Sequence, residues 1–173
     1  MTTVLETPRL ILRHLRRDDV DAIFDVIGDA ETMQYYPRSF ERKDAEEWVE
    51  RNLQRYAKQG NGLYAVVLKS TCEVIGDCGL VQQNVEGISL LEVGYHLRRD
   101  QWGRGYATEA ARACLDYAFR NMDADKVISL IRPENLPSRR VAERNGMKIE
   151  RQITYFGLPH LIYVMTRGDY GQA

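Results

Sequence analysis

A loop with two glycines, residues 102–108 with the sequence WGRGYAT, runs directly into a helical pattern. Gly103 and Gly105 have no Cβ, so their backbone can approach an anion closely. The first amides of the following helix lack acceptors within the helix and favour a phosphate or pyrophosphate group, and Arg104 adds a positive charge nearby. A tight strand-to-helix turn, with the glycines present for packing alone, explains the same residues.

Two common phosphate-binding motifs do not fit this loop. A P-loop requires a lysine after its last glycine, and none follows here. A Rossmann fingerprint requires a third glycine and a place after the first strand. Thr108 occupies that third position, and the loop lies in the middle of the chain.

A single carboxylate, Glu92, interrupts an otherwise apolar strand pattern in the segment LLEVG. Burial disfavours the charged form, so we expect a raised pKa and a useful general base. Strand alternation places His96 on the same face, and an imidazole could also act as a base. The alternatives are a Glu92 that pairs with an arginine or orients a substrate, and a His96 that is solvated or satisfied by a neighbour.

Alternating and helical patterns predict a mixed α/β (α+β) fold in a single domain spanning residues 1–173. Three consecutive strands with short polar links predict an antiparallel meander. Helices are expected at about 20–27, 32–36, 42–58, 106–119 and 135–145. Strands are expected in RLILRHL, LYAVVLK, EVIGDCGLVQQ, ISLLEVGYHLRR, KVISLIR, MKIERQITYF and HLIYVMTRG, the last two as a hairpin around residues 157–159.

Composition excludes several classes of protein. The net charge of −1 gives no basis for nucleic-acid binding, and no apolar run is long enough to span a membrane. The first residues lack the pattern of a signal peptide, and three cysteines without C-x-x-C spacing predict reduced thiols in a cytoplasmic protein. The three histidines are scattered, so we expect no metal site.

The loop and four other segments together resemble the GNAT N-acetyltransferases, in particular their ribosomal-protein-alanine branch. This family carries Q/R-x-x-G-x-G/A at the start of its central helix, and the branch carries W-G-[KR]-G-[YI]-A-T-E-A. Trp102 stands where Gln or Arg is usual. The segments TPRLILR, VIGDCGL, EVGYHL and NLPSRRVAERNGM extend the resemblance over nearly the whole chain, with Met147 replacing the usual Phe.

The resemblance implies a fold and a co-substrate. The sheet would have seven strands, mostly antiparallel, and would splay between strands 4 and 5, EVGYHL and KVISLIR. The loop would hold the pyrophosphate of acetyl-coenzyme A, and the pantetheine arm would lie in the V, against strand-edge groups of residues 93–97. The residues expected to bind the coenzyme are Val93, Tyr95, His96, Leu97, Trp102, Gly103, Arg104, Gly105, Tyr106, Ala107, Thr108, Asn135, Ser138 and Arg140.

The same resemblance implies two catalytic residues. Glu92 would be the base, acting directly or through a water. Ser138 would donate a hydrogen bond or a proton to the leaving thiolate. Acetyl transfer also needs donors for the oxyanion, and we expect these to be backbone amides near Tyr95 and His96. Asn135 would contact the pantetheine amides. Helix capping is the alternative for Asn135 and Ser138, and solvation is the alternative for Arg139 and Arg140.

The acceptor is an amine, with a peptide or ribosomal-protein N-terminus as the first expectation. The acidic segment 18–37 contains no Lys or Arg and could attract a cation, or it could serve helix capping and solvation. A small amine such as a polyamine, an amino acid or a drug is the alternative acceptor. A non-catalytic coenzyme A-binding sensor is the alternative class, and a monomer or a homodimer is expected.

Overall fold

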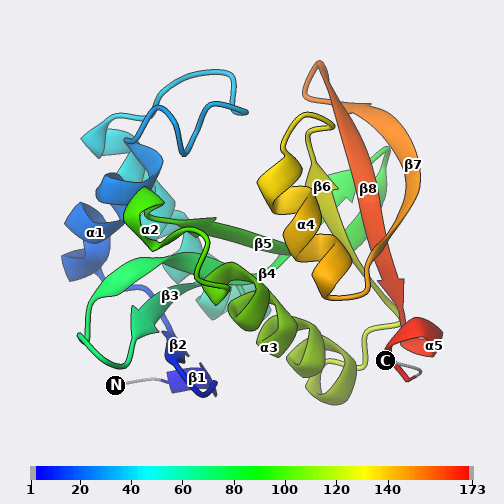
Figure 1. The fold of residues 1–173 in the computed structure, drawn as a ribbon, viewed down its shortest axis with the longest axis horizontal. Helices are drawn as coiled ribbons and strands as arrows, with labels where there is room; N and C mark the ends of the chain where they lie inside the picture. The colour runs from blue at the N-terminus through cyan, green and yellow to red at the C-terminus, as the bar shows by residue number, and fades with distance from the viewer. Residues whose placement is uncertain (1–2, 172–173) are drawn as a thin grey trace.

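One mixed sheet of eight strands, in the order β1-β2-β3-β4-β5-β6-β8-β7, organises the protein (Figure 1). The computed structural model describes residues 3–171. The strands are β1 (Thr3–Glu6), β2 (Leu10–Arg13), β3 (Leu63–Leu68), β4 (Val74–Val85), β5 (Ile88–Leu97), β6 (Lys126–Ile131), β7 (Lys148–Tyr155) and β8 (Leu158–Thr166). The helices are η1 (Arg17–Asp19), α1 (Val20–Ile27), α2 (Arg42–Gln59), η2 (Arg99–Gln101), α3 (Tyr106–Asn121), α4 (Leu136–Arg144) and α5 (Arg167–Tyr170).

The sheet divides between β5 and β6. These two strands are parallel and share one residue pair, Glu92 with Ile128, whereas β4 and β5 pair along their whole length. Two side-chain hydrogen bonds hold the apex of the resulting V. The Ser129 hydroxyl donates to the Val93 carbonyl at 3.0 Å, and the Leu130 amide donates to Glu92 Oε1 at 3.0 Å. The predicted splay between EVGYHL and KVISLIR is therefore confirmed.

Different helices cover the two faces of the first half of the sheet. α3 packs on one face, where Cys114 lies in the same core as Cys78 of β4. α1 and α2 pack on the other, where Val49 lies in the same core as Ala65 of β3. Successive residues of a strand alternate between faces, and the Trp48 indole of α2 donates to Asp77 Oδ2 at 2.7 Å. The side chains of Asp77, and of Glu92 and His96 on β5, therefore face α2.

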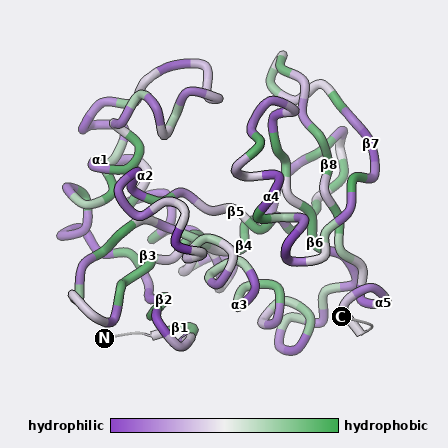
Figure 2. Tube along the Cα trace, in the orientation of Figure 1, coloured by the Kyte–Doolittle hydropathy of each residue, from purple (hydrophilic) through white to green (hydrophobic). Residues whose placement is uncertain are grey.

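The apolar residues of α3 recur every three or four positions and form a buried stripe, apart from the half-buried Ala107 at its start. Its members Ala110, Ala111, Cys114, Leu115, Ala118 and Phe119 are at most 3% exposed, and hydrophobic and hydrophilic segments alternate along this helix (Figure 2). Cys78 and Cys114 lie in this core as free thiols, with their sulfurs 3.7 Å apart.

Two local predictions were wrong, and the position of one turn differs from the prediction. An extra strand, β1, pairs with β2 and makes the sheet eight-stranded. It is a four-residue edge strand, too short to show alternation before the Pro8 turn. No helix forms at 32–36: Asp29 Oδ1 accepts the amides of Glu31 and Thr32 as a helix cap would, but the segment continues as turns and bends to Pro37, which cannot continue a helix. The predicted final hairpin is confirmed as β7–β8, but it turns at residues 156–157, both with positive φ, so Pro159 lies within β8.

Candidate active site

A cavity of about 920 Å³ lies in the V and is lined by elements of both halves of the sheet. Most residues predicted to form the site line it: Glu92, Tyr95, His96, Leu97, Trp102, Gly103, Gly105, Tyr106, Ala107, Thr108, Asn135, Ser138 and Arg140. Two predicted residues do not. The Val93 side chain is fully buried in the core beneath α3. Arg104 contributes a carbonyl that accepts from Arg9 Nη1 at 2.9 Å.

The glycine loop presents free amides to this cavity. Gly103 and Gly105 have φ of 72° and 80°, a left-handed conformation that strains other residues. Within residues 3–171, the amides of Tyr106, Ala107 and Thr108 have no side-chain cap and no backbone acceptor, and the first bond of the helix runs from Glu109 to the Gly105 carbonyl. These orphan donors form an anion site at the N-terminus of a long helix.

The edge of β5 that faces the V is also partly free. The Arg98 amide donates to the Ile75 carbonyl at 2.8 Å, so alternate residues of the strand bond to β4 and the others point into the V. Val93 O accepts from Ser129, and Leu97 O accepts from the Trp102 indole at 2.8 Å. Tyr95, between them, keeps its edge groups available to an extended ligand.

Glu92 is held by two donors at the apex of the V. Its Oε1 accepts from the Leu130 amide at 3.0 Å, and its Oε2 accepts from Gln83 Nε2 at 2.8 Å. Burial raises the pKa of Glu92, although these two hydrogen bonds oppose the shift. The carboxylate can therefore act as a base at the cavity wall. It also satisfies an amide that the splay leaves unpaired, which gives it a structural task as well.

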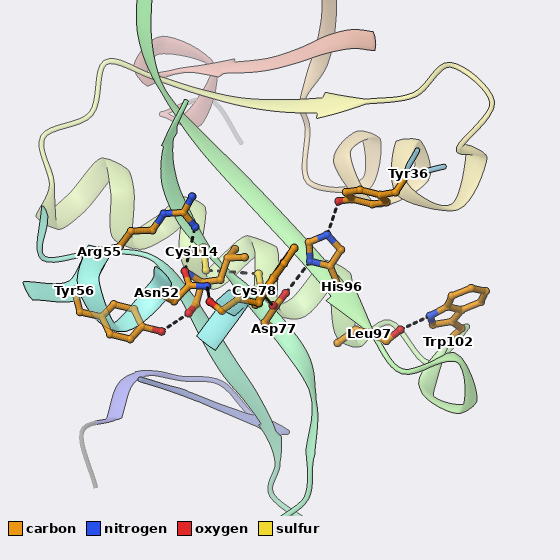
Figure 3. A network of polar contacts seen from close by, with 12 residues as sticks. Tyr36, Asn52, Arg55, Tyr56, Asp77, Cys78, His96, Leu97, Trp102 and Cys114 are labelled. Carbon is orange, nitrogen blue, oxygen red and sulfur yellow. Dashed lines mark hydrogen bonds and ion pairs between the residues drawn. The ribbon is translucent and has the colours of Figure 1, made fainter. Parts of the chain in front are cut away.

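His96 lies in a chain of polar contacts (Figure 3). Its Nδ1 is 2.8 Å from Asp77 Oδ1, its Nε2 is 2.6 Å from the Tyr36 hydroxyl, and Asp77 is 1% exposed. Burial alone would lower the pKa of His96, but Tyr36 and Asp77 together raise the pKa of His96 to about 10. An imidazolium at neutral pH donates from both nitrogens and cannot accept a proton, which argues against His96 as the base.

Ser138 and Asn135 combine helix capping with exposure to the cavity. Asn135 Oδ1 accepts a hydrogen bond from the Ser138 amide at 3.2 Å and so caps α4. This oxygen therefore has the helix-capping role, which was the alternative to a contact with pantetheine. The Ser138 carbonyl accepts from the Tyr95 hydroxyl at 2.8 Å. Tyr95 therefore contributes a phenol beside Ser138, and burial raises the pKa of this phenol.

The acidic segment is largely neutralised by arginines from outside it. Arg99 contacts Asp29 Oδ2 at 3.2 Å and Glu31 Oε2 at 2.5 Å. Arg42 contacts Asp21 at 2.7 Å. These pairs favour the capping and solvation interpretation over attraction of a cationic acceptor.

Asp77, Tyr36 and Trp48 were not identified from the sequence. Asp77 carried the same signal as Glu92, a lone carboxylate inside an apolar strand, in the segment VIGDCGL. Tyr36 lies on a loop and Trp48 on α2, both distant in sequence from β5. The residues around them therefore gave no indication that they reach the site.

The fold and this cavity define a class: an N-acyltransferase fold whose central helix begins at an anion-binding loop. The chain belongs to the GNAT acetyltransferase family, because residues 9–148 match the family model of the acetyltransferase (GNAT) domain. It is 38% identical to the uncharacterized protein YkkB of Bacillus subtilis, over 93% of this chain and 94% of that protein. It is 31% identical to the uncharacterized N-acetyltransferase YnaD of the same organism, over 84% and 83% of the two chains.

Solved structures agree with this assignment. An acetyltransferase from Agrobacterium tumefaciens is 28% identical with a TM-score of 0.81, covering 95% of this chain and 94% of that one. Two more distant structures show a likeness of fold alone. One is the aminoglycoside acetyltransferase AAC(6')-Ib, 18% identical, and the other is RimL, a ribosomal α-N-protein acetyltransferase, 17% identical. Both were solved in complex with coenzyme A.

The residues of this chain fit coenzyme A as a co-substrate. The free amides at the start of α3 suit a pyrophosphate, and the free edge of Tyr95 suits an amide-bearing arm. The buried Thr108 hydroxyl has no partner among the described residues. Arg140 and Arg144 of α4 line the same cavity and add positive charge near α3.

Proposed function

We propose that this protein transfers the acetyl group of acetyl-coenzyme A to a primary amine, by direct attack while both substrates are bound. The thioester, when bound, supplies an activated acetyl carbon and a thiolate leaving group. The observation that carries the proposal is the meeting of the α3 anion site, the free edge of β5 and the Glu92 carboxylate in one cavity.

Each group has a task in this proposal. The amides of Tyr106 to Thr108 bind the pyrophosphate, and the Tyr95 backbone aligns the arm. Glu92 takes the proton that the amine must lose, directly or through a water. Ser138 donates a hydrogen bond to the departing sulfur, and the Tyr95 hydroxyl, which donates to the Ser138 carbonyl, helps to hold Ser138 in place.

A protein or peptide N-terminal α-amino group is the first acceptor we propose. Its ordinary pKa of about 7.7–8.0 is easier for a raised glutamate to deprotonate than a lysine amine near 10.4. A small amine is the second candidate. Tyr36 and Trp48 each pair with the His96 ring, and Phe40 pairs with both of them, at the α2 side of the cavity. Aromatic faces attract small cationic amines.

An acceptor screen tests the proposal. Purified protein with acetyl-coenzyme A is offered N-terminal peptides, polyamines and amino acids, thiol release is followed, and products are weighed by mass spectrometry. We expect amine-dependent thiol release matched by a product with one added acetyl group. Thiol release at the hydrolysis background with every amine would refute the proposed activity.

A further inference from the structure

One face of α2 lines the cavity on the side away from α3. Trp48, Arg51, Asn52 and Arg55 follow i, i+3, i+4 and i+7 spacing and all contribute to the cavity wall. The opposite wall includes Glu92 at the apex of the V. The cavity therefore has an acceptor end, defined here by these four residues of α2 together with Glu92.

The two arginines at this end lack acidic partners. Among residues 3–171, no carboxylate oxygen lies within 4.0 Å of a nitrogen of Arg51 or Arg55. The one side-chain bond of Arg55 runs from Nη1 to the neutral Asn52 Oδ1 at 3.3 Å. Arg55 is half-buried and lines the cavity, so its guanidinium is not fully hydrated.

The arrangement is electrostatically unfavourable without an anion. Like charges four residues apart destabilise a helix. Burial first, and then the charge of Arg51, lowers the pKa of Arg55. Of the other arginines of the cavity, Arg132 pairs with Glu134 at 2.5 Å, and Arg140 and Arg144 belong to α4 rather than to the α2 wall.

The charges of Glu92 and Asp77 oppose the lowering of the Arg55 pKa, but the acidic groups of the cavity are held by other partners. Glu31 is paired with Arg99, and Asp77 is paired with His96. Glu92 is already held by two donors. The acceptor end thus combines a base for an amine with two guanidinium groups that suit a carboxylate, which arginine binds with its fork of donors.

We propose that the acceptor carries a carboxylate near its reactive amine, and that Arg51 and Arg55 bind this carboxylate while Glu92 faces the amine. This deepens the proposed function, on which it rests. A free amino acid presents this chemistry through its α-carboxylate, and a peptide presents it through an acidic side chain next to its N-terminus.

The test compares matched acceptors. Each proteinogenic amino acid is measured against its own α-carboxamide, and alanyl-glutamate against alanyl-glutamine, in the thiol-release assay. Binding of the same compounds to the protein saturated with coenzyme A is measured by calorimetry. We expect at least one acid to have a KM and a Kd about tenfold or more below those of its amide, as for a charged hydrogen bond.

Variants assign the effect to the arginines. Arg55→Gln should remove most of the preference for the carboxylate, Arg55→Lys should restore part of it, and the exposed Lys58→Gln, on the same helix, should leave it unchanged. Thermal melts exclude misfolded variants.

The outcomes separate the two proposals. Carboxylate-selective binding that depends on Arg55, without turnover, would support the inference and refute the transferase activity. Acetylation of amines with no preference for the acid, or an equal loss for acid and amide in Arg55→Gln, would overturn the inference and leave the activity standing. If no acid of the panel binds better than its amide, the inference is wrong.

Discussion

Replacing Glu92 by glutamine separates its proposed catalytic task from its structural one. Glutamine keeps an oxygen that can accept the Leu130 amide, now 3.0 Å from Glu92 Oε1. Its new amide group would meet Gln83 Nε2, another donor. Gln83 can rotate its own amide, because Gln83 Oε1 accepts from the Tyr155 hydroxyl at 3.2 Å and that hydroxyl can instead accept. The apex of the V is therefore retained in Glu92→Gln.

The expected loss is mainly in rate. Removing one acid–base group should lower kcat by roughly 10²-fold at neutral pH. From pH 7 to 9 the neutral fraction of an α-amine rises from roughly a tenth to roughly nine-tenths. Higher pH should therefore recover at most about tenfold. The cost in stability should be small, about 1 kcal/mol for one exchanged hydrogen bond.

Two profiles against pH provide the assay. The rate with saturating acetyl-coenzyme A should lose the part of its acid limb that reports Glu92, and Glu92→Gln should keep only the rise between pH 7 and 9 that reports the amine. Burial raises the pKa of Glu92, so its contribution to stability is present below the ordinary pKa of about 4.3 and is lost as pH rises through the raised value. Glu92→Gln should remove this dependence. A variant that runs at the parent rate at every pH would show that Glu92 only satisfies the Leu130 amide.

Three further predictions follow from the site. Gly105→Val should weaken coenzyme A binding strongly in calorimetry. The control is Gly87→Val in the β4–β5 turn, where φ is a similar 84°, and this variant should bind coenzyme A as the parent does. Equal affinities of the two variants would rule out the phosphate-loop assignment. Asp77→Asn should lower the free energy of unfolding by about 3 kcal/mol near neutral pH. The pKa of His96 is raised to about 10, so the stabilisation from the Asp77–His96 pair is fully present below pH 6.5 and is lost as pH rises through about 10. Denaturant melts of parent and variant at pH 6 and 10.5 check this. The same difference in unfolding free energy at both pH values would contradict it. Ser138→Ala should reduce kcat only a few-fold with no recovery at high pH, and a loss as large as that of Glu92→Gln would make the serine more than a hydrogen-bond donor.

Patterns within single segments predicted much of this fold. The helix α3, the meander β3–β5 and the loop at Gly103 and Gly105 each depend on residues that are close in sequence, where propensity and periodicity act. The splay between β5 and β6 and the co-substrate followed from the resemblance to a family. The edge strand β1 was missed, because four residues are too few to establish alternation.

The polar interior of the site depends on register, which sequence patterns leave open. Asp77 and His96 are directly opposite in the β4–β5 ladder, and a shift of one residue would turn one of them to the other face. The pairing of Arg99 with Asp29 and Glu31 likewise depends on how a loop lies over η2. The sequence of the acidic segment therefore does not show that arginines from elsewhere in the chain neutralise much of its charge in the folded protein.

Because β5 and β6 share a single residue pair, the sheet consists of two separately paired halves, here called plates, that meet along one line. Each plate keeps its own ladder, since β4–β5 and β6–β8 pair along their lengths. Two hydrogen bonds and the packing of α3 set the angle between the plates. The Ser129 hydroxyl donates to the Val93 carbonyl, and the Leu130 amide donates to the Glu92 carboxylate. The V can therefore widen or narrow by bending at this line, without the loss of a single strand pairing within either plate.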